Sequence, residues 1–354
     1  MRAIFRYGIM LLCVCCSRVF ADNALTEVLE SRGRPLHVRV EFEQKTIHDP
    51  DLNLDKTLPP ELLKGVEPAT ARTELFRGSF YYSDGRARYD LEAIGNAAPK
   101  GPPVILKWTM IRTPERSESA VQWSGQKGLI GIIADSAEIQ PWHTLDLALG
   151  LRLYGKQEWI TKDDWRGAEL RDSPPEKIML RLKGKGKVLH SMTFTRELGW
   201  ALENVQMEFP DPEVKEEIKC SDFRIIGDMR LPFKVERQNT YRDSTGQMRH
   251  PITHVITVGS YEVADAERAR EWFALRWPKG SAVLDQRTAF QMDLEESVVL
   301  SDEEIARRLQ AQEAKDEKDL EGARELMKQI RQHDSPQGGD GESHPTTGKA
   351  EKSP

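Results

Sequence analysis

Apolar and polar residues alternate along most of the chain, which is the pattern of β-strands with one buried face. The clearest example is Ala71 to Gly95, where two alternating runs flank the turn Ser83-Asp84-Gly85. An Asp-Gly turn between alternating runs predicts a β-hairpin. On the first strand Phe76, Gly78, Phe80 and Tyr82 share one face, and Ala87, Tyr89 and Leu91 share it on the second.

The same alternation recurs on both sides of this hairpin. It predicts further strands at residues 35–47, 104–112, 120–123, 129–133, 177–182, 188–196, 200–209, 218–226, 231–242 and 252–263. Turn residues separate most of these runs, as expected for neighbours in an antiparallel sheet. We therefore predict a mainly β (α+β) fold with a large antiparallel sheet and one apolar face.

Two stretches favour helices instead. Residues 23–32 place Leu25, Val28 and Leu29 on one stripe, and Gly33 is positioned to end the helix. Residues 141–155 are rich in leucine, with spacings that fit a helix or, in part, a strand. We favour a helix that begins near Thr144, which can cap it.

The first 21 residues have the three parts of a secretory signal peptide. Arg2 and Arg6 precede an apolar run at residues 8–16, and small residues lie at Val19 and Ala21. The run is too short to span a bilayer, which needs about 20 residues. Export to the periplasm or cell envelope is therefore predicted, with no transmembrane segment after cleavage. A retained anchor is the alternative, and lipidation is disfavoured because no small residue precedes Cys13, Cys15 or Cys16.

Charge and cysteine content narrow the range of partners. The chain has 51 basic and 57 acidic residues, a net charge of −6, and loss of Arg2, Arg6 and Arg18 with the leader leaves −9. This argues against nucleic acid, which needs a basic face. Only Cys220 lies beyond the leader, so no intramolecular disulfide is expected, and a buried thiol is favoured.

Two local motifs are distinctive: the turn Tyr82-Ser83-Asp84-Gly85 followed by Arg86 and Arg88, and the ending Phe273…Pro278-Lys279-Gly280…Val283…Asp285. Both resemble motifs of the LolA/LolB-like superfamily of periplasmic lipoprotein-carrier half-barrels. The resemblance covers about residues 22–292. It implies a sheet curled into an open half-barrel, with helices across its mouth and an apolar concave face that shelters acyl chains. The chain is longer than those carriers, and no residue marks a docking site for a lipoprotein-release machine.

A sheltered concave face would bind an acyl chain largely through the hydrophobic effect, at about 0.8 kcal/mol per buried methylene. The candidate lining residues are Val38, Val40, Phe42, Phe80, Tyr82, Tyr89, Leu91, Trp108 and Met110. We therefore predict a non-catalytic carrier or sensor of lipid, an acylated protein or another hydrophobic ligand. The alternative is an envelope interaction protein in which these residues are ordinary core and a partner protein binds the tail or a sheet edge.

The sequence contains little that indicates an enzyme active site or a metal-binding site. The sequence has no G-x-S-x-G, H-E-x-x-H or glycine-rich phosphate motif. Pro251 prevents His250 and His254 from forming a helical pair, and no third ligand is nearby in sequence. Residues 51–55 resemble a calcium loop, but Lys56 and Leu62 occupy the positions that need Gly and Glu. No catalytic residue, metal or cofactor is predicted.

The chain changes character after Leu300. Ser301-Asp302-Glu303-Glu304 is a capping-box sequence, and a charged helical segment is expected over residues 301–333. Its thin apolar stripe (Ile305, Leu309, Leu326 and Ile330) favours a solvated helix, with a partner-binding coiled coil as the alternative. Residues 334–354 are predicted to be disordered. The predicted organisation is a signal peptide at 1–21, a β domain at 22–300, this helix and this tail.

Overall fold

The computed structural model describes residues 25–30, 36–48, 72–95, 105–123, 125–135, 144–153, 160–171, 174, 176–184, 188–209, 214–242, 248–249 and 252–333. The chain divides into two compact units, Met1–Val299 and Leu300–Pro354. The predicted signal peptide, calcium-like loop, His250 and disordered tail lie outside the described residues. None of the helices in the described ranges is long and apolar enough to cross a bilayer.

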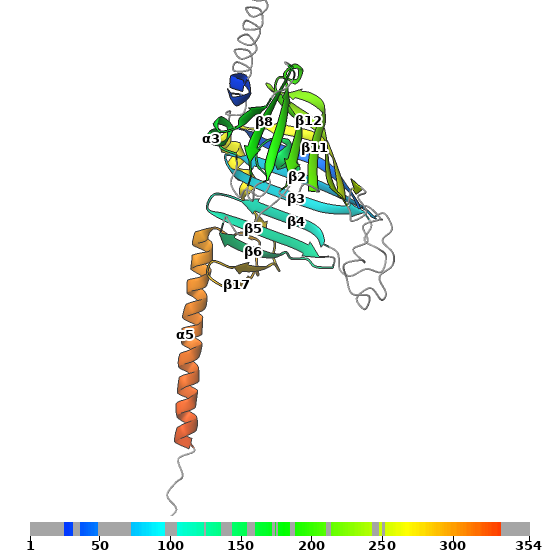
Figure 1. Cartoon of the computed structure of the whole chain (residues 1–354). Coiled ribbons are helices and arrows are strands. Elements are labelled where there is room, and N and C mark those ends of the chain that lie inside the picture. The colour runs from blue at the N-terminus through cyan, green and yellow to red at the C-terminus, as the bar shows by residue number, and fades with distance from the viewer. Residues whose placement is uncertain are drawn as a thin grey trace, which may run out of the picture. The chain divides into compact units, whose positions relative to one another are not determined.

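One 16-stranded sheet dominates the first unit (Figure 1). Its strands are β1 (His37–His48), β2 (Arg72–Ser83), β3 (Arg86–Gly95), β4 (Ile105–Arg112), β5 (Arg116–Trp123), β6 (Ile130–Asp135), β7 (Glu169–Arg171), β8 (Lys177–Lys183), β9 (Leu189–Thr195), β10 (Ala201–Glu208), β11 (Val214–Ile226), β12 (Met229–Arg242), β13 (Met248–Arg249), β14 (Ile252–Val263), β16 (Ala282–Asp285) and β17 (Phe290–Asp293).

The strand order is β17-β16-β6-β5-β4-β3-β2-β1-β14-β12-β11-β10-β9-β8-β7, with β13 attached to β12. Among the described strands, β17 and β7 end this order and do not pair with each other, so the sheet is curled but open (Figure 1). The predicted fold class is therefore confirmed. β5 begins earlier than predicted, at Arg116, because Ser117 and Glu118 are buried on opposite faces and hide the alternation.

Register places large side chains together on one face, called the inner face below. Phe80 lies opposite Val40 on β1 and Tyr89 on β3, and the rings of Phe80 and Tyr89 stack with centroids 4.9 Å apart. A Cβ atom at Gly78 would lie 2.6 Å from the ring of Phe42, so only glycine leaves room for that ring. These residues belong to one large hydrophobic core.

Short helical segments contribute to this core. Residues 25–30 are helical, and Val28 is fully buried. All five residues of α2 (Thr144–Ala148) are buried, whereas α3 (Lys162–Arg166) contributes Trp165. The helix begins at Thr144 as predicted but is shorter than expected. The chain turns at Gly150, whose φ of 67° ends the helix and lets Leu153 reach the core separately.

A second, smaller core lies on the opposite, outer face of β4–β6. The closing segment contains α4 (Ala266–Arg270), η4 (Glu271–Phe273) and the two-stranded sheet of β15 (Arg276–Trp277) and β18 (Val298–Val299). Trp277 is fully buried against Gly131, where a Cβ atom would lie 2.3 Å from the indole ring. β16 then pairs in parallel with β6, which a pattern of hairpins does not predict.

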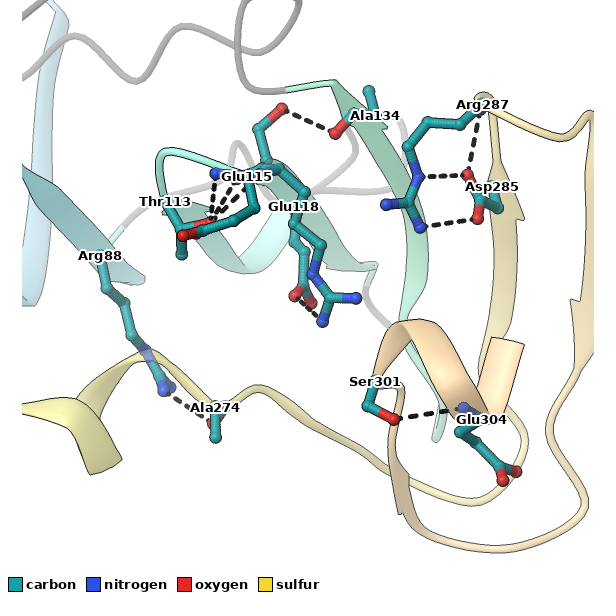
Figure 2. Close-up of polar contacts among 12 residues, drawn as sticks. Arg88, Thr113, Glu115, Glu118, Ala134, Ala274, Asp285, Arg287, Ser301 and Glu304 are labelled. Carbon is teal, nitrogen blue, oxygen red and sulfur yellow. Dashed lines mark hydrogen bonds and ion pairs between the residues drawn. The ribbon is translucent and has the colours of Figure 1, made fainter. Parts of the chain in front are cut away.

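Polar contacts hold this closing segment (Figure 2). Arg88 on β3 donates hydrogen bonds to the carbonyl oxygens of Trp272 (3.0 Å) and Ala274 (3.4 Å). Arg287 pairs with the buried Asp285 at 2.9 Å, and Arg116 pairs with the buried Glu118 at 2.7 Å. Burial raises the pKa of Glu118, although the charge of Arg116 opposes the shift.

The second unit contains the helix α5 (Asp302–His333). Ser301 Oγ accepts a hydrogen bond from the backbone N–H of Glu304 at 3.2 Å (Figure 2). The carboxylate of Glu304 pairs with Arg307 and Arg308, and the hydrogen bond from Arg307 lowers its pKa to about 2. Leu320, Leu326 and Met327 are exposed on this helix.

Candidate functional site

The nine residues predicted to line a ligand site all lie on the inner face. The register pairs Val38 with Tyr82, Val40 with Phe80, Phe80 with Tyr89, Tyr89 with Met110, and Leu91 with Trp108, and Phe42 lies opposite Gly78. Directly opposite residues of an antiparallel pair point to the same side of the sheet. The sheet therefore brings together the complete predicted set.

Burial divides these nine residues into two groups. Six are buried in the large core: Val38, Val40, Phe42, Phe80, Tyr89 and Met110. Tyr82 and Leu91 are half-buried, and Trp108 is 40% exposed. Leu145, Leu147 and Leu149 join the same core from the α2 segment. The centre of the inner face is thus packed with side chains, and its accessible parts lie toward the two ends of the strands.

A buried polar cluster ties α2 to the inner face. The hydroxyl of Tyr89 donates a hydrogen bond to Asp146 Oδ1, and Arg152 Nη1 lies 3.8 Å from Asp146 Oδ2. All three side chains are buried. Burial first, and the negative charge of Asp146 second, raise the pKa of Tyr89 well above its ordinary value. The phenol therefore keeps its proton and remains a donor across the neutral range.

A cavity of about 330 Å³ lies at the end of the sheet that holds the β2–β3 and β11–β12 turns; we call it the mouth cavity. Its volume is within the range of small-molecule sites, at the lower end. The lining residues come from the strand ends and the helical segments: Leu36, Tyr82, Asp84, Leu149, Gly150, Leu151, Ile160, Trp165, Gly199, Trp200, Ala201, Ile225, Asp228, Met229, Arg230 and Leu231.

Two tryptophans, Trp165 and Trp200, line the mouth cavity. Trp165 packs edge-on against Phe194, with ring centroids 5.9 Å apart. The indole N–H of Trp200 donates to Glu27 in the N-terminal helical residues at 2.6 Å. Trp200 also has a φ of 60°, a left-handed conformation that costs a bulky residue of order 1–3 kcal/mol. The surrounding packing holds the indole in the cavity wall against this cost.

Apolar surface continues onto the rim of the mouth cavity. Ile225, at the tip of the β11–β12 hairpin, is 65% exposed, and Met229 on the returning strand is half-buried. Asp84, Asp228 and Arg230 are the charged residues among the lining. An apolar interior with a few charges at the opening is the usual arrangement of a site for a hydrophobic ligand.

A second cavity, of about 380 Å³, lies near α3, β7 and β8. Its lining includes Asp163, Asp164, Glu169, Arg181 and Lys183. Asp163 and Glu169 are exposed and form ion pairs with Arg166 and Arg171. Such a charged, solvated lining offers little hydrophobic binding energy, and the mouth cavity is the better ligand site.

Polar side chains replace apolar ones at the opposite end of the inner face. Thr46, His254 and Arg237 lie side by side on β1, β14 and β12, and Arg237 hydrogen-bonds Glu216 on β11. Burial first, and the charge of Arg237 second, lower the pKa of His254 to about 4. No group of three metal-ligating His, Cys, Asp or Glu side chains occurs in the part of the chain that the structure describes.

Sequence reasoning found only part of each end of the inner face: Tyr82 at the mouth cavity, and Leu91 and Trp108 toward the other end. Trp200 was predicted as an ordinary strand start, because nothing local reveals its left-handed backbone. The polar end had a usable signal. Phe42 is followed at inward positions by Gln44 and Thr46, and Val235 is followed by Arg237. When inward-facing positions change from apolar to polar residues on neighbouring strands, and at about the same distance along those strands, the polar residues indicate a site.

Cys220 is buried, as predicted, and its Sγ lies 3.8 Å from the carbonyl oxygen of Ala148 in α2. This contact places the thiol inside the packed part of the inner face rather than in either accessible end.

No protein-family model matches the sequence, and a comparison with curated proteins found no match. Among solved structures, the matches include the following two. A DUF1329 family protein from Desulfovibrio piger is 7% identical, with a TM-score of 0.39, and the match covers 70% of this chain and 92% of that one. A LolA superfamily protein from Nitrosomonas europaea is 12% identical, with a TM-score of 0.35, covering 69% and 94%. Both TM-scores lie below 0.5, so neither similarity supports a statement about fold or function.

Proposed function

We propose that this chain is an exported, non-catalytic carrier or sensor that binds lipid, a lipoprotein acyl chain or another hydrophobic ligand within its curled sheet. The mouth cavity is the observation that carries this proposal. It combines Trp165, Trp200 and aliphatic side chains in a volume suited to part of an acyl chain. Each methylene buried there would contribute about 0.8 kcal/mol, so no specific polar contact is needed for useful affinity.

The nine predicted lining residues would contribute to ligand binding in three different ways. Tyr82 lines the mouth cavity directly. The six buried members form the packed floor that keeps the sheet curled around the ligand. Leu91 and Trp108, at the other end of the inner face, offer accessible apolar surface for a longer ligand.

Export to the periplasm or cell envelope is part of the same proposal. Its support is the basic, apolar and small-residue series of residues 1–21. In that compartment a carrier would meet membrane lipids and acylated proteins, which are the partners that we propose.

Binding of a fluorescent acyl probe to the purified chain tests the proposal. Trp200→Glu and Met229→Glu each place a charge at the mouth cavity and are expected to weaken probe binding at least tenfold, about 1.4 kcal/mol. Trp272→Glu, which changes a half-buried tryptophan beside Tyr81 outside the cavity, is the matched control. Binding that survives both cavity variants, with folding verified by circular dichroism, would contradict the site.

A second candidate function is an envelope interaction protein with a filled core. Its support is the burial of six of the nine predicted lining residues, together with the exposed Leu320, Leu326 and Met327 on α5. In this alternative a partner protein would bind the helix or a sheet edge. This alternative would be favoured if the chain binds no acyl probe but binds a partner protein through α5, and if Leu326→Glu abolishes that binding.

A further inference from the structure

On the inner face, the side chains of neighbouring strands change from apolar to polar at about the same distance from the mouth cavity. Thr46 on β1 lies opposite His254 on β14, which lies opposite Arg237 on β12. The resulting polar band consists of Gln44, Thr46, His48, Glu74, Glu216, Arg237, Asn239 and His254. Val38 and Thr46 are eight residues apart on β1, which corresponds to about 26 Å. The band is therefore separate from the mouth cavity, which lies at the other end of the strands.

Several groups of the band are buried. Glu216 is 3% exposed and Thr46 is 4% exposed, and the carboxylate of Glu216 pairs with Arg237. Gln44 Nε2 donates to His254 Nδ1 at 3.3 Å, and Thr46 Oγ1 lies 3.1 Å from the same nitrogen. A buried ion pair of this kind adds little net stability, because desolvation offsets its attraction. A binding role explains why polar groups occupy positions that elsewhere on this face are apolar.

Two buried atoms of the band lack a hydrogen-bond partner among the described residues. They are the carbonyl oxygen Oδ1 of Asn239 and the ring nitrogen Nε2 of His48, which lies 3.5 Å from the carboxylate of Glu74 without forming a hydrogen bond. Buried polar atoms are nearly always paired, so each such atom needs an explanation. A ligand that donates a hydrogen bond would satisfy Asn239 Oδ1.

Apolar surface lies directly beside the band. Phe76 on β2 is opposite Gln44, and Leu91, Trp108, Val121 and Ile130 follow one another across β3–β6 at the adjacent level. Trp108 and Ile130 are 40% and 44% exposed. This end of the inner face thus has a polar half and an accessible apolar half, which fits a molecule with a head and a chain.

We propose that the polar band binds the head group of an amphiphile whose chain lies on the apolar strip from Phe76 to Ile130. The proposal extends the proposed function to a second site and names its ligand class. Of the side chains that the structure describes, the charged ones that face this site are Arg237, Glu216 and Glu74, and His48 and His254 are the other titratable groups there. Arg72, at the start of β2, lies opposite His48 at the same end of the band. Cationic and anionic residues therefore balance, which favours an uncharged head group that donates hydrogen bonds through hydroxyl groups.

The test compares two amphiphiles with the same brominated acyl chain, a monoacylglycerol and the free fatty acid. Binding to the full chain is followed by quenching of tryptophan fluorescence. The monoacylglycerol is expected to bind at least tenfold more tightly, because the carboxylate of the fatty acid would face Glu74 and Glu216. Trp108→Phe should remove much of the quenching, whereas Trp200→Phe should not, which locates the chain on the apolar strip.

Variants in the band test the head group itself. Asn239→Leu should weaken monoacylglycerol binding several-fold, and Glu74→Gln should improve fatty-acid binding and reduce the discrimination. Glu43→Gln is the control, because Glu43 is exposed on the outer face of β1 next to Gln44. Equal affinity for both amphiphiles, or band variants that behave like Glu43→Gln, would overturn the head-group site and leave the mouth cavity standing. If neither amphiphile binds, the head-group site is overturned, and the acyl-probe experiment decides separately on the mouth cavity.

Discussion

The hydroxyl of Tyr89 on β3 donates a hydrogen bond to the carboxylate of Asp146 in α2, inside the core of the curled sheet. The two residues are 57 positions apart in the sequence, so the bond joins an early hairpin to a helix from the middle of the chain. It fixes α2 across the inner face and thereby sets which part of that face is packed.

We predict that Tyr89→Phe lowers the free energy of unfolding by about 1–3 kcal/mol, because the buried carboxylate of Asp146 loses a donor. Urea unfolding of the purified chain measures the change. Tyr81→Phe is the matched control, since Tyr81 is on the outer face of the neighbouring strand, where Arg39 and Arg88 lie over its ring. Equal stability of Tyr89→Phe and the control would show that the bond contributes nothing.

The contact between Trp277 and Gly131 gives a second prediction. Gly131→Ala should lower the free energy of unfolding by about 1–3 kcal/mol, because the new methyl group would overlap the buried indole. Gly259→Ala is the control, because the nearest atom to its added Cβ is 3.6 Å away, and it should change stability by less than about 1 kcal/mol. A Gly131→Ala protein as stable as the control would mean that Trp277 does not pack there.

Ala289, in the turn between β16 and β17, has a φ of 54° and is exposed. The left-handed conformation costs a non-glycine residue roughly 1–2 kcal/mol, and the added flexibility of glycine in the unfolded state offsets part of this. Ala289→Gly should therefore raise the midpoint of thermal unfolding slightly. Ala274→Gly, at an exposed position with a φ of −92°, should lower it. Shifts in the same direction for both variants would contradict the assigned turn.

His254 predicts a loss of stability in mild acid. Burial and Arg237 lower its pKa from 6.5 to about 4 in the folded chain, whereas the unfolded chain keeps the ordinary value. Between these values the unfolded state binds a proton that the folded state does not, so stability falls as the pH drops from 6.5 to 4. The full effect is about 3 kcal/mol.

Urea unfolding at pH 7 and pH 4.5 measures this dependence, and His254→Gln should flatten it. His48 and Glu74 also face this ring, and His254→Gln leaves both in place. Any pH dependence of stability that remains in the variant therefore comes from groups such as these. An unchanged pH dependence in His254→Gln would assign the acid sensitivity to other groups.

The elements that follow from local chemistry were predictable. The turn at Asp84-Gly85 has φ values of 46° and 76°, which only residues such as Asp, Asn and Gly adopt readily, and the sequence places those residues there. The alternation of Val38, Val40 and Phe42 likewise determines the buried face of β1.

Features that depend on distant parts of the chain were not predictable. The parallel pairing of β16 with β6 joins segments about 150 residues apart, and no local pattern encodes it. The end of α2 depends on the backbone of Gly150, and the cavity wall depends on the left-handed Trp200. Arg237 and Asn239 resemble solvent-facing residues until the register places them on the inner face.

Native mass spectrometry of the chain, purified gently from a host that exports it, tests the central claim most directly. The account predicts a mass excess that denaturation releases as phospholipid, fatty acid or another hydrophobic molecule, and that Trp200→Glu reduces. A chain that carries no such mass, and takes up none when lipid vesicles are added, would contradict ligand binding and favour the interaction protein.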